Sequence, residues 1–317
     1  MKFTIWGARG SHPKPLTPQD IRSKISAVVQ RIQPKDIQST QNREAFMARL
    51  PTWLFGTYSG NTSCIEVQSC SGATILFDCG TGLVEYWKNQ LNKGAPLTGN
   101  EFHIFFTHYH YDHIQGFPFF VPAYIAGNSV SMYSPHPNLE DVLRNQMRHP
   151  YFPVTIEDKM SAELSFRQLP PRGTFPLNDI ELQWLPLEHP GGSYGYSVRC
   201  DDVQLLYCTD VDLNESFYRD TQENNSFFKN ADVMIIDTQY TLDEALKKFD
   251  WGHTSYIHAV DFAIHWNIKK IIMFHHEPAY SDQKIFSNRQ AAEDYARNRG
   301  NKTLEIQIAQ EGMSIEV

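Results

Sequence analysis

The order of hydrophobic and polar positions along the chain alternates between two periods. Short apolar or alternating runs are typical of β-strands, and apolar residues three or four apart are typical of helices. Strands are predicted at residues 2–6, 63–68, 73–77, 103–107, 129–133, 181–186, 194–200, 204–208, 233–236, 270–274 and 304–307. Helices are predicted at residues 21–32, 82–92, 138–147, 242–249, 254–266 and 288–299. Strands that dominate early and alternate with helices late favour an α+β fold, an αββα sandwich of two mixed β-sheets flanked by helices.

A polar, helical segment at about residues 11–58 interrupts this pattern. It separates the strand-turn ending at Gly10 from the next one, which begins at Gly60. We expect a single domain over residues 1–317 that carries this segment as an insertion. Four interpretations stay open, namely a cap, a lid, a dimer contact and a solvated excursion of the surface. An exposed helical insertion is also compatible with a homodimer.

Composition narrows the class of protein. The 317 residues are 41% hydrophobic and 20% charged, which is enough for a substantial core. The formal net charge of −8 disfavours broad electrostatic capture of nucleic acid. The five cysteines are an odd number without paired metal spacing, which predicts reduced thiols and a cytoplasmic location. There is no apolar run of membrane-spanning length and no apolar leader segment, so no membrane partner is expected.

The residues that follow the strand at 103–107 carry the chemistry. His108, His110, Asp112 and His113 lie within six positions, directly after an apolar run. Imidazole and carboxylate are ligands that zinc, manganese and iron accept in proteins. His108 and His110 can bind one metal ion from the same side of the chain, and Asp112 and His113 can face a second ion. The alternative is a solvated histidine-rich turn.

Three further candidates also stand at the ends of apolar runs. His189 precedes a glycine-rich turn, Asp210 ends the strand at 204–208, and His275 ends the strand at 270–274. A carboxylate has two oxygens, so Asp210 is the natural ligand shared by two cations. Asp212 remains an alternative to Asp210, and His276 remains an alternative to His275.

The order of these residues resembles the metallo-β-lactamase fold hydrolases. The resemblance covers nearly the whole chain outside residues 11–58, and it is closest to the phosphodiesterase branch, which includes tRNase Z and the cyclic-phosphate phosphodiesterases. Four further features are similar to that branch: the strand-turn at 75–82, the Gly195-Tyr196 pair after His189, the strand at 231–238 with its acidic Asp237, and Gly252-His253-Thr254. Members of the branch often carry Glu where this chain has Asp237.

The resemblance implies a mechanism with two divalent metal ions, zinc first, with manganese or iron as alternatives. It places His108, His110 and His189 on one ion, Asp112, His113 and His275 on the other, and Asp210 between them. Two such cations lower the pKa of a bridging water and neutralise phosphate oxygens during attack. Asp112 would orient the hydroxide, His253 would protonate the leaving group, and Asp237 would hold His253 in position.

The resemblance leaves several substrates open. We expect a small phosphodiester, most simply a cyclic nucleotide or another cyclic phosphate. Residues 151–177 show no glycine-rich basic arm of the kind that grips tRNA, so a nucleic-acid substrate is disfavoured. The alternatives are a tRNA 3′-processing endonuclease, a lactone or thioester hydrolase, and a descendant without activity that binds a partner.

Other residues near the motifs carry weaker signals. Arg9 and His12 follow a strand-turn and are candidate contacts to substrate phosphate. The aromatic residues around the first motif could stack on a base, although core packing explains most of them equally well. These aromatic residues are Tyr109, Tyr111, Phe117, Phe119, Phe120 and Tyr124.

Overall fold

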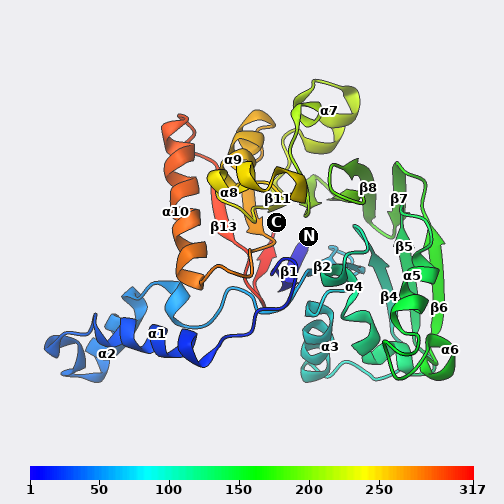
Figure 1. Ribbon diagram of the computed structural model, residues 1–317, viewed down its shortest axis with the longest axis horizontal. Coiled ribbons are helices and arrows are strands. Elements are labelled where there is room, and N and C mark those ends of the chain that lie inside the picture. The colour runs from blue at the N-terminus through cyan, green and yellow to red at the C-terminus, as the bar shows by residue number, and fades with distance from the viewer.

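The computed structural model describes residues 1–317 and contains two seven-stranded β-sheets that pack face to face (Figure 1). In spatial order, the first sheet consists of β14 (Ser314–Glu316), β1 (Lys2–Gly7), β2 (Cys64–Gln68), β3 (Thr74–Phe77), β4 (Glu101–Phe105), β5 (Ser129–Ser134) and β6 (Glu163–Gln168). The second consists of β13 (Glu305–Ile308), β12 (Lys270–Phe274), β11 (Val233–Asp237), β10 (Val203–Cys208), β9 (Ser193–Cys200), β8 (Ile180–Leu187) and β7 (Gly173–Leu177). Both sheets are mixed: β3 to β6 and β10 to β13 run parallel, and the other pairs are antiparallel.

The main hydrophobic core lies between the two sheets. Phe77 of the first sheet contacts Tyr196 and Tyr207 of the second, with ring centroids 5.0 Å and 5.4 Å apart. These three side chains belong to a cluster of 25 buried hydrophobic residues drawn from both sheets. Alternation of inward-facing apolar residues along each strand produces this layer.

Helices cover the two outer faces of the sheets. On the first sheet, α3 (Gly82–Asn92) and α5 (Leu139–Gln146) bury Leu83, Trp87 and Leu143. On the second sheet, α9 (Tyr256–His265) and α10 (Asp282–Asn298) bury Phe262 and Ala292. The shorter helices are α4 (Tyr111–Ile114), α6 (Ile156–Lys159), α7 (Gln222–Phe228) and α8 (Leu242–Lys247). The predicted αββα sandwich of two mixed sheets is therefore confirmed.

The differences from the predicted elements have local causes. Strands β6, β7 and β14 were not predicted; all three lie at sheet edges, where half-exposed side chains weaken the apolar signal. Helix α7 was also not predicted, because it is short and rich in polar residues. The helix predicted at 21–32 begins earlier, at Pro18, because Thr17 and Asp20 form a reciprocal capping box at its start.

Residues 11–58, called the N-terminal insertion below, lie beside the second sheet (Figure 1). They contain α1 (Pro18–Val29) and α2 (Thr40–Arg49), with one short 3-10 turn between the two helices and another after α2. Trp53 and Tyr58 of the insertion pack against Tyr280 and Ile285, and Lys24 forms a buried ion pair with Asp282 at 2.8 Å. The insertion is thus fixed to the start of α10.

No helix in the structure combines the length and the apolar character that a membrane crossing requires.

Candidate metal centre

The predicted metal ligands meet at one end of the sandwich, where strands from both sheets finish. His108 follows β4 of the first sheet, while Asp210 and His275 follow the parallel strands β10 and β12 of the second. His189 leaves β8 in the same direction. Asp210 and His275 adopt positive φ angles of 49° and 58°. Such strained backbone is typical of functional sites, because the surrounding fold must hold it in place.

The first group of side chains consists of His108, His110, His189 and Asp210. One potential ligand atom from each lies within 4.8 Å of all the others. Nε2 of His108 lies 3.6 Å and Nε2 of His189 lies 3.7 Å from Oδ2 of Asp210. Nδ1 of His110 lies 3.0 Å from His108 Nε2 and 3.2 Å from His189 Nε2. These atoms surround one small volume.

The second group consists of Asp112, His113, His275 and, again, Asp210. Nε2 of His113 and Nε2 of His275 each lie 3.3 Å from Oδ1 of Asp210. Oδ2 of Asp112 lies 3.5 Å from His113 Nε2 and 3.1 Å from His275 Nε2. Asp210 therefore turns one carboxylate oxygen toward each group, as a ligand shared by two cations requires.

The imidazole rings are oriented by their second nitrogens. Nδ1 of His113 donates to Asp78 at 2.8 Å, Nδ1 of His275 donates to Gln239 at 3.0 Å, and Nδ1 of His189 donates to the Gly252 carbonyl at 2.8 Å. Each bond directs Nε2 of the ring into its group. Ligating histidines in proteins are fixed in this way.

One atom tests whether these residues suit a metal ion. Nε2 of His113 is buried and has no hydrogen-bond partner. A buried polar atom without a partner is costly, and a cation between His113 and Asp210 would satisfy it. The donor set of nitrogens and carboxylate oxygens also matches what zinc prefers. The residues therefore fit a pair of divalent cations.

Charge is concentrated in the second group. Burial lowers the pKa of His113 and His275, but the neighbouring carboxylates, above all Asp210, outweigh it and raise both, that of His275 to about 9. Burial raises the pKa of Asp112 and Asp210, yet the surrounding imidazoles hold both well below the usual range. Without a cation, two protonated imidazoles thus balance the carboxylates, and cation binding must displace those protons.

The first group is electrostatically different. Burial lowers the pKa of His108, His110 and His189, and the nearby imidazoles add to this effect. These three rings are therefore neutral at pH 7. Neutral imidazole is the form that binds a metal ion, so this group needs no proton release before binding.

His253 lies beside both groups. Its Nδ1 donates to Oδ2 of Asp237 at 2.7 Å, and Asp237 also accepts from the backbone amide of Gln239 at 2.9 Å. The ring stacks on His275 with centroids 4.9 Å apart. The preceding residue, Gly252, has φ 73°, and a Cβ there would lie 2.7 Å from Nδ1 of His189. The close approach of His189 to the residue before His253 therefore requires glycine at position 252.

Side chains from both groups, together with His253, line one cavity of about 470 Å³, which we call the reaction cavity. It is lined by Ser11, His110, Tyr111, Asp112, His189, Pro190, Asp210, Asp250, Trp251, His253 and His275. The backbone amide of Ser11 donates to Oδ2 of Asp112 at 2.7 Å. The sequence motifs, far apart along the chain, therefore converge on a single space.

The alternatives left open by the sequence lie elsewhere. Nε2 of His276 lies 3.0 Å from the Ala309 carbonyl, and burial lowers the pKa of His276 to about 3, so this ring faces away as a neutral group. Asp212 belongs to neither group of ligand atoms. His12 is exposed, and its Nδ1 lies 3.0 Å from the Pro13 carbonyl.

The structure argues against Arg9, a candidate contact to substrate phosphate. Arg9 is buried, its Nε donates to the Ser59 carbonyl at 3.0 Å, and its Nη1 donates to the Glu277 carbonyl at 3.1 Å. The guanidinium therefore ties the strand-turn after β1 to the loop after β12.

Two important residues were given no role from the sequence. Asp78 is fully buried and accepts from His113 and from the hydroxyls of Thr107 and Tyr207. It stands at the end of an apolar run, the same signal that marked Asp210, and could have been found by it. Gln239 holds His275, but no pattern in the sequence distinguishes it.

The fold and the paired groups of ligand atoms define a metal-dependent hydrolase with a metallo-β-lactamase fold. The chain belongs to the family described as "Beta-lactamase superfamily domain", whose model matches residues 73–276.

Sequence relatives point to the same branch. "Ribonuclease Z" of Prochlorococcus marinus (strain MIT 9301) is 23% identical over 318 residues, covering 76% of this chain and 96% of the relative. The predicted resemblance to the phosphodiesterase branch is thereby confirmed.

Solved structures share the fold over the whole chain. The metallo-β-lactamase fold protein YhfI from Bacillus subtilis superposes with a TM-score of 0.64 at 16% identity, covering 100% of this chain and 98% of that one. The short form of human tRNase Z gives 0.60 at 16% identity, with coverage of 100% and 99%. A diphosphatase from the PhnP family gives 0.60 at 18% identity, with coverage of 100% and 97%.

Proposed function

We propose that this protein is a dinuclear metal-dependent phosphodiesterase that hydrolyses a small phosphodiester, such as a cyclic nucleotide or another cyclic phosphate. One observation carries the proposal. Asp210 directs one oxygen into each of two groups of ligand atoms, and His253, held by the buried Asp237, lines the reaction cavity beside them.

Each predicted ligand has a position consistent with its role. His108, His110 and His189 would hold one cation, Asp112, His113 and His275 the other, and Asp210 both. When bound, two divalent cations, zinc first, supply Lewis acidity toward phosphate oxygens and toward water. The amide of Ser11 fixes the Asp112 carboxylate, which can orient a water molecule in the cavity by accepting a hydrogen bond from it.

His253 would supply the proton that the leaving group needs. Its Nδ1–H is held by Asp237, so a second proton on Nε2 has a nearby carboxylate to stabilise the resulting imidazolium. That Nε2 proton can pass to the departing oxygen of the diester, which leaves His253 neutral with Nδ1–H still donating to Asp237. The stacking on His275 restricts rotation of the ring.

The size of the substrate is inferred from the surroundings of the cavity. Residues 151–177 contain α6, β6 at the edge of the first sheet and β7 at the edge of the second, with no long basic arm among them. A cavity of about 470 Å³ lies in the range that small ligands occupy. The net charge of −8 also disfavours a long polyanion.

A second candidate function is tRNA 3′-end processing. It is favoured by the names of the relatives, since the bacterial proteins are called Ribonuclease Z and one structural neighbour is human tRNase Z. Hydrolysis of a lactone or thioester is less well supported, because the His253–Asp237 pair assists a leaving group that those substrates do not require.

A panel of substrates tests the proposal. Metal-loaded protein would be given 2′,3′- and 3′,5′-cyclic nucleotides, a p-nitrophenyl phosphodiester, a 3′-extended pre-tRNA and a lactone, with Asp210→Ala as the control. Turnover of a cyclic nucleotide that is lost in the variant would support the proposal. Cleavage of pre-tRNA alone would establish the second function, and lactone turnover with inert phosphodiesters would overturn both.

We also propose a homodimer formed through the N-terminal insertion. Ile21, Ile25 and Val29 form an exposed row on α1, beside a groove floored by Leu54 and Phe55. The exposed row and the groove lie on the same face of the insertion. In two copies related by a twofold axis, the row of each copy can therefore pack into the groove of the other. Antiparallel α1 helices would also bring Asp20, in the first turn, near Arg31 of the other copy, which follows the last turn.

All five cysteines are unpaired, which supports a reducing compartment and so the proposed cytoplasmic location.

A further inference from the structure

A second cavity adjoins the reaction cavity. It has a volume of about 730 Å³, and we call it the aromatic cavity. Its lining consists of Tyr109, Tyr111, Ile114, Gln115, Pro118, Phe119, Val142, Asn145, Gln146, Arg148, Tyr151 and Phe152. Tyr111 lines both cavities, so a ligand with its phosphate at the metal centre can extend directly into the aromatic cavity.

Several aromatic rings in this lining are exposed. Tyr111, Phe119 and Tyr151 are 77%, 58% and 72% exposed. Their neighbours Phe117 and Phe120 are fully buried and account for the packing of the same turn. Core packing therefore does not explain Phe119, whose exposed ring meets one other aromatic ring, that of Phe152, edge-on at 5.6 Å between centroids. Exposed rings grouped around a cavity offer faces on which a flat ligand can stack.

The polar residues of the lining add a cation and an amide. Arg148 is exposed, forms no ion pair with a carboxylate, and lies with its guanidinium 5.9 Å from the ring centre of Tyr151. Asn145 is exposed, and its amide takes part in no hydrogen bond within the chain. A side-chain amide can both donate to and accept from the edge of a base, and a free guanidinium attracts a phosphorylated ligand.

We propose that the aromatic cavity binds the nucleobase of the substrate, with the base stacked on the exposed rings and its edge facing Asn145. This inference rests on the proposed phosphodiesterase function and names its substrate class, a phosphodiester that carries a nucleoside. Aromatic stacking tolerates different bases, because every base has a π face. Volumes of about 730 Å³ and 470 Å³ both lie within the range of small-ligand pockets.

The contribution of the nucleoside to kcat/KM can be measured with two esters that share the same leaving group. Thymidine 5′-(p-nitrophenyl phosphate) and methyl p-nitrophenyl phosphate differ in the nucleoside, whose base would enter the aromatic cavity; the Phe119 variants report the contribution of the base itself. The wild-type protein should have a kcat/KM about tenfold or more higher for the nucleoside ester, since stacking of one base typically contributes a factor of that size. Phe119→Ala should lower this ratio by about fivefold or more, and Phe119→Tyr should restore most of it.

The matched control is Leu97→Ala, which removes an apolar side chain of 57% exposure outside both cavities. This variant should keep the wild-type ratio of the two esters. Equal kcat/KM for the two esters in the wild-type protein would overturn the base site while leaving the phosphodiesterase in place.

Binding without turnover separates the two hypotheses. Calorimetry would compare adenosine 5′-monophosphate with ribose 5-phosphate, which lacks the base, on wild-type and Phe119→Ala protein. Tighter binding of the nucleotide that depends on Phe119 supports the base site even if neither ester is hydrolysed, a result that would overturn only the proposed function. Equal affinity for the two ligands overturns the base site.

Discussion

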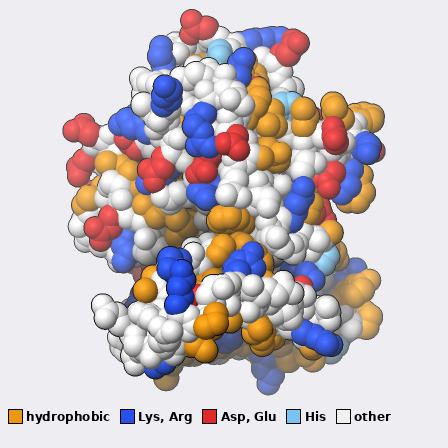
Figure 2. All heavy atoms as spheres, turned by 90° about the vertical axis from the view of Figure 1, so that its left-hand side faces the viewer, with side chains coloured by type: hydrophobic (Ala, Val, Ile, Leu, Met, Phe, Trp, Pro, Cys, Tyr) orange, Lys and Arg blue, Asp and Glu red, His pale blue; other side chains and the backbone are white.

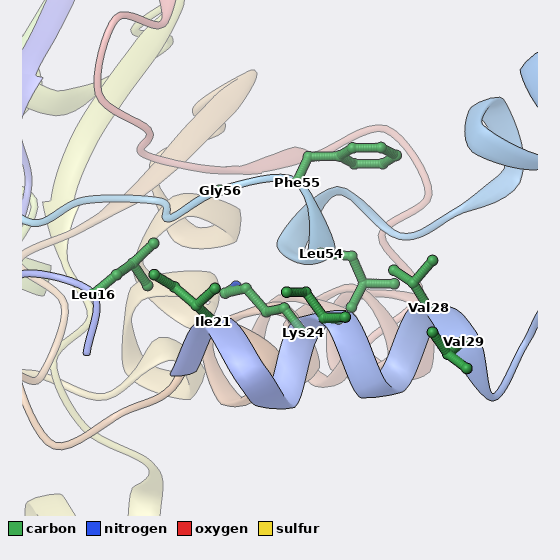
Figure 3. Close-up of a pocket in the computed structure, with 9 residues that line it drawn as sticks. Leu16, Ile21, Lys24, Val28, Val29, Leu54, Phe55 and Gly56 are labelled. Carbon is green, nitrogen blue, oxygen red and sulfur yellow. The ribbon is translucent and has the colours of Figure 1, made fainter. Parts of the chain in front are cut away.

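The candidate metal centre and the N-terminal insertion depart from the usual distribution of side chains in opposite directions. At the metal centre, ionisable groups lie inside: His113 is fully buried and Asp210 is 1% exposed. On the insertion, apolar groups lie outside: Ile25 and Val29 are 60% and 63% exposed. Figure 3 shows Ile21, Val28 and Val29 along α1, facing Leu54 and Phe55 across an open groove. In Figure 2, hydrophobic side chains lie among basic ones on this side of the molecule.

Each region indicates a binding partner from outside the chain, namely cations at the metal centre and an apolar surface at the insertion. The free energies that these partners would contribute differ in size. An uncompensated buried charge costs several kcal/mol, because its hydration is lost. An exposed aliphatic side chain costs about 25 cal/mol for each Å² that a partner could cover. The metal centre should therefore respond to single substitutions much more strongly than the insertion.

Loss of the shared carboxylate should give the largest effect. We expect Asp210→Ala to lower kcat/KM about 10³-fold or more, because both cations lose a ligand and the two groups are no longer linked. Elemental analysis should find fewer than two metal ions per chain. Asp212→Ala is the matched control, since Asp212 is a nearby carboxylate outside both groups. Full activity and metal content in Asp210→Ala would contradict the assignment.

Loss of the proton donor should separate catalysis from metal binding. His253→Ala should keep both metal ions and lose about 10²- to 10⁴-fold in kcat on diesters with poor leaving groups. A p-nitrophenyl diester should be affected much less, because p-nitrophenolate departs without a proton. His265→Ala, at the exposed end of α9, serves as the control. Equal losses on both substrates would remove His253 from this role.

Metal removal should give the protein a new dependence on pH. Without cations, His275, with a pKa of about 9, and His113, whose pKa is also raised, stabilise the fold below an unfolded pKa near 6.5. That stabilisation is lost as pH rises through the folded values, so the Tm of the metal-free protein should fall between pH 6.5 and 9. His108, His110 and His189, whose pKa values are lowered, are neutral in the folded state over this window, and in the unfolded state they lose their protons near its lower end.

Metal-loaded protein is the control for that measurement. Bound cations displace the imidazole protons, so its Tm should stay nearly constant over the same window. Cations at about 100 times their dissociation constant should add about 2.7 kcal/mol of stability for each site that they occupy. A metal-free protein with a Tm independent of pH would show that His113 and His275 carry no such charge.

The smallest effect is expected on the insertion. Ile25→Glu should raise the dissociation constant of the proposed homodimer about tenfold or more, measured by light scattering or sedimentation, with little change in Tm. Leu97→Glu places the same charge at a similarly exposed position outside the insertion and should leave the association unchanged. A wild-type protein that is monomeric at all concentrations would exclude this role for α1.

The sequence could predict those site residues that stand at a recognisable position along the chain. The strand ends carrying His108, Asp210 and His275 were visible because an apolar run stops abruptly at a ligand-type residue. Asp78 also follows an apolar run and could have been recognised, whereas Gln239 is not a ligand type and its contact with His275 leaves no pattern in the sequence. Arg9 could only be a candidate, because a buried guanidinium satisfied by carbonyls and a phosphate-binding one look identical in sequence.

The exposed aromatic residues near the first motif illustrate the same limit. Phe117, Phe119 and Phe120 follow one another within a single turn, and their composition does not reveal which ring faces outward. The 3-10 geometry of residues Phe117–Phe119 decides it, and that geometry depends on tertiary packing.

Gly252 connects two functions that are usually considered separately. Its carbonyl holds Nδ1 of His189, a candidate metal ligand, and the next residue is His253, the candidate proton donor. A side chain at this position would collide with Pro190, at 2.1 Å, and with His189. A single substitution here would therefore misalign metal binding and leaving-group protonation together. Loss of the His253 side chain, in contrast, would remove the candidate proton donor and leave the Gly252 carbonyl that holds His189 in place.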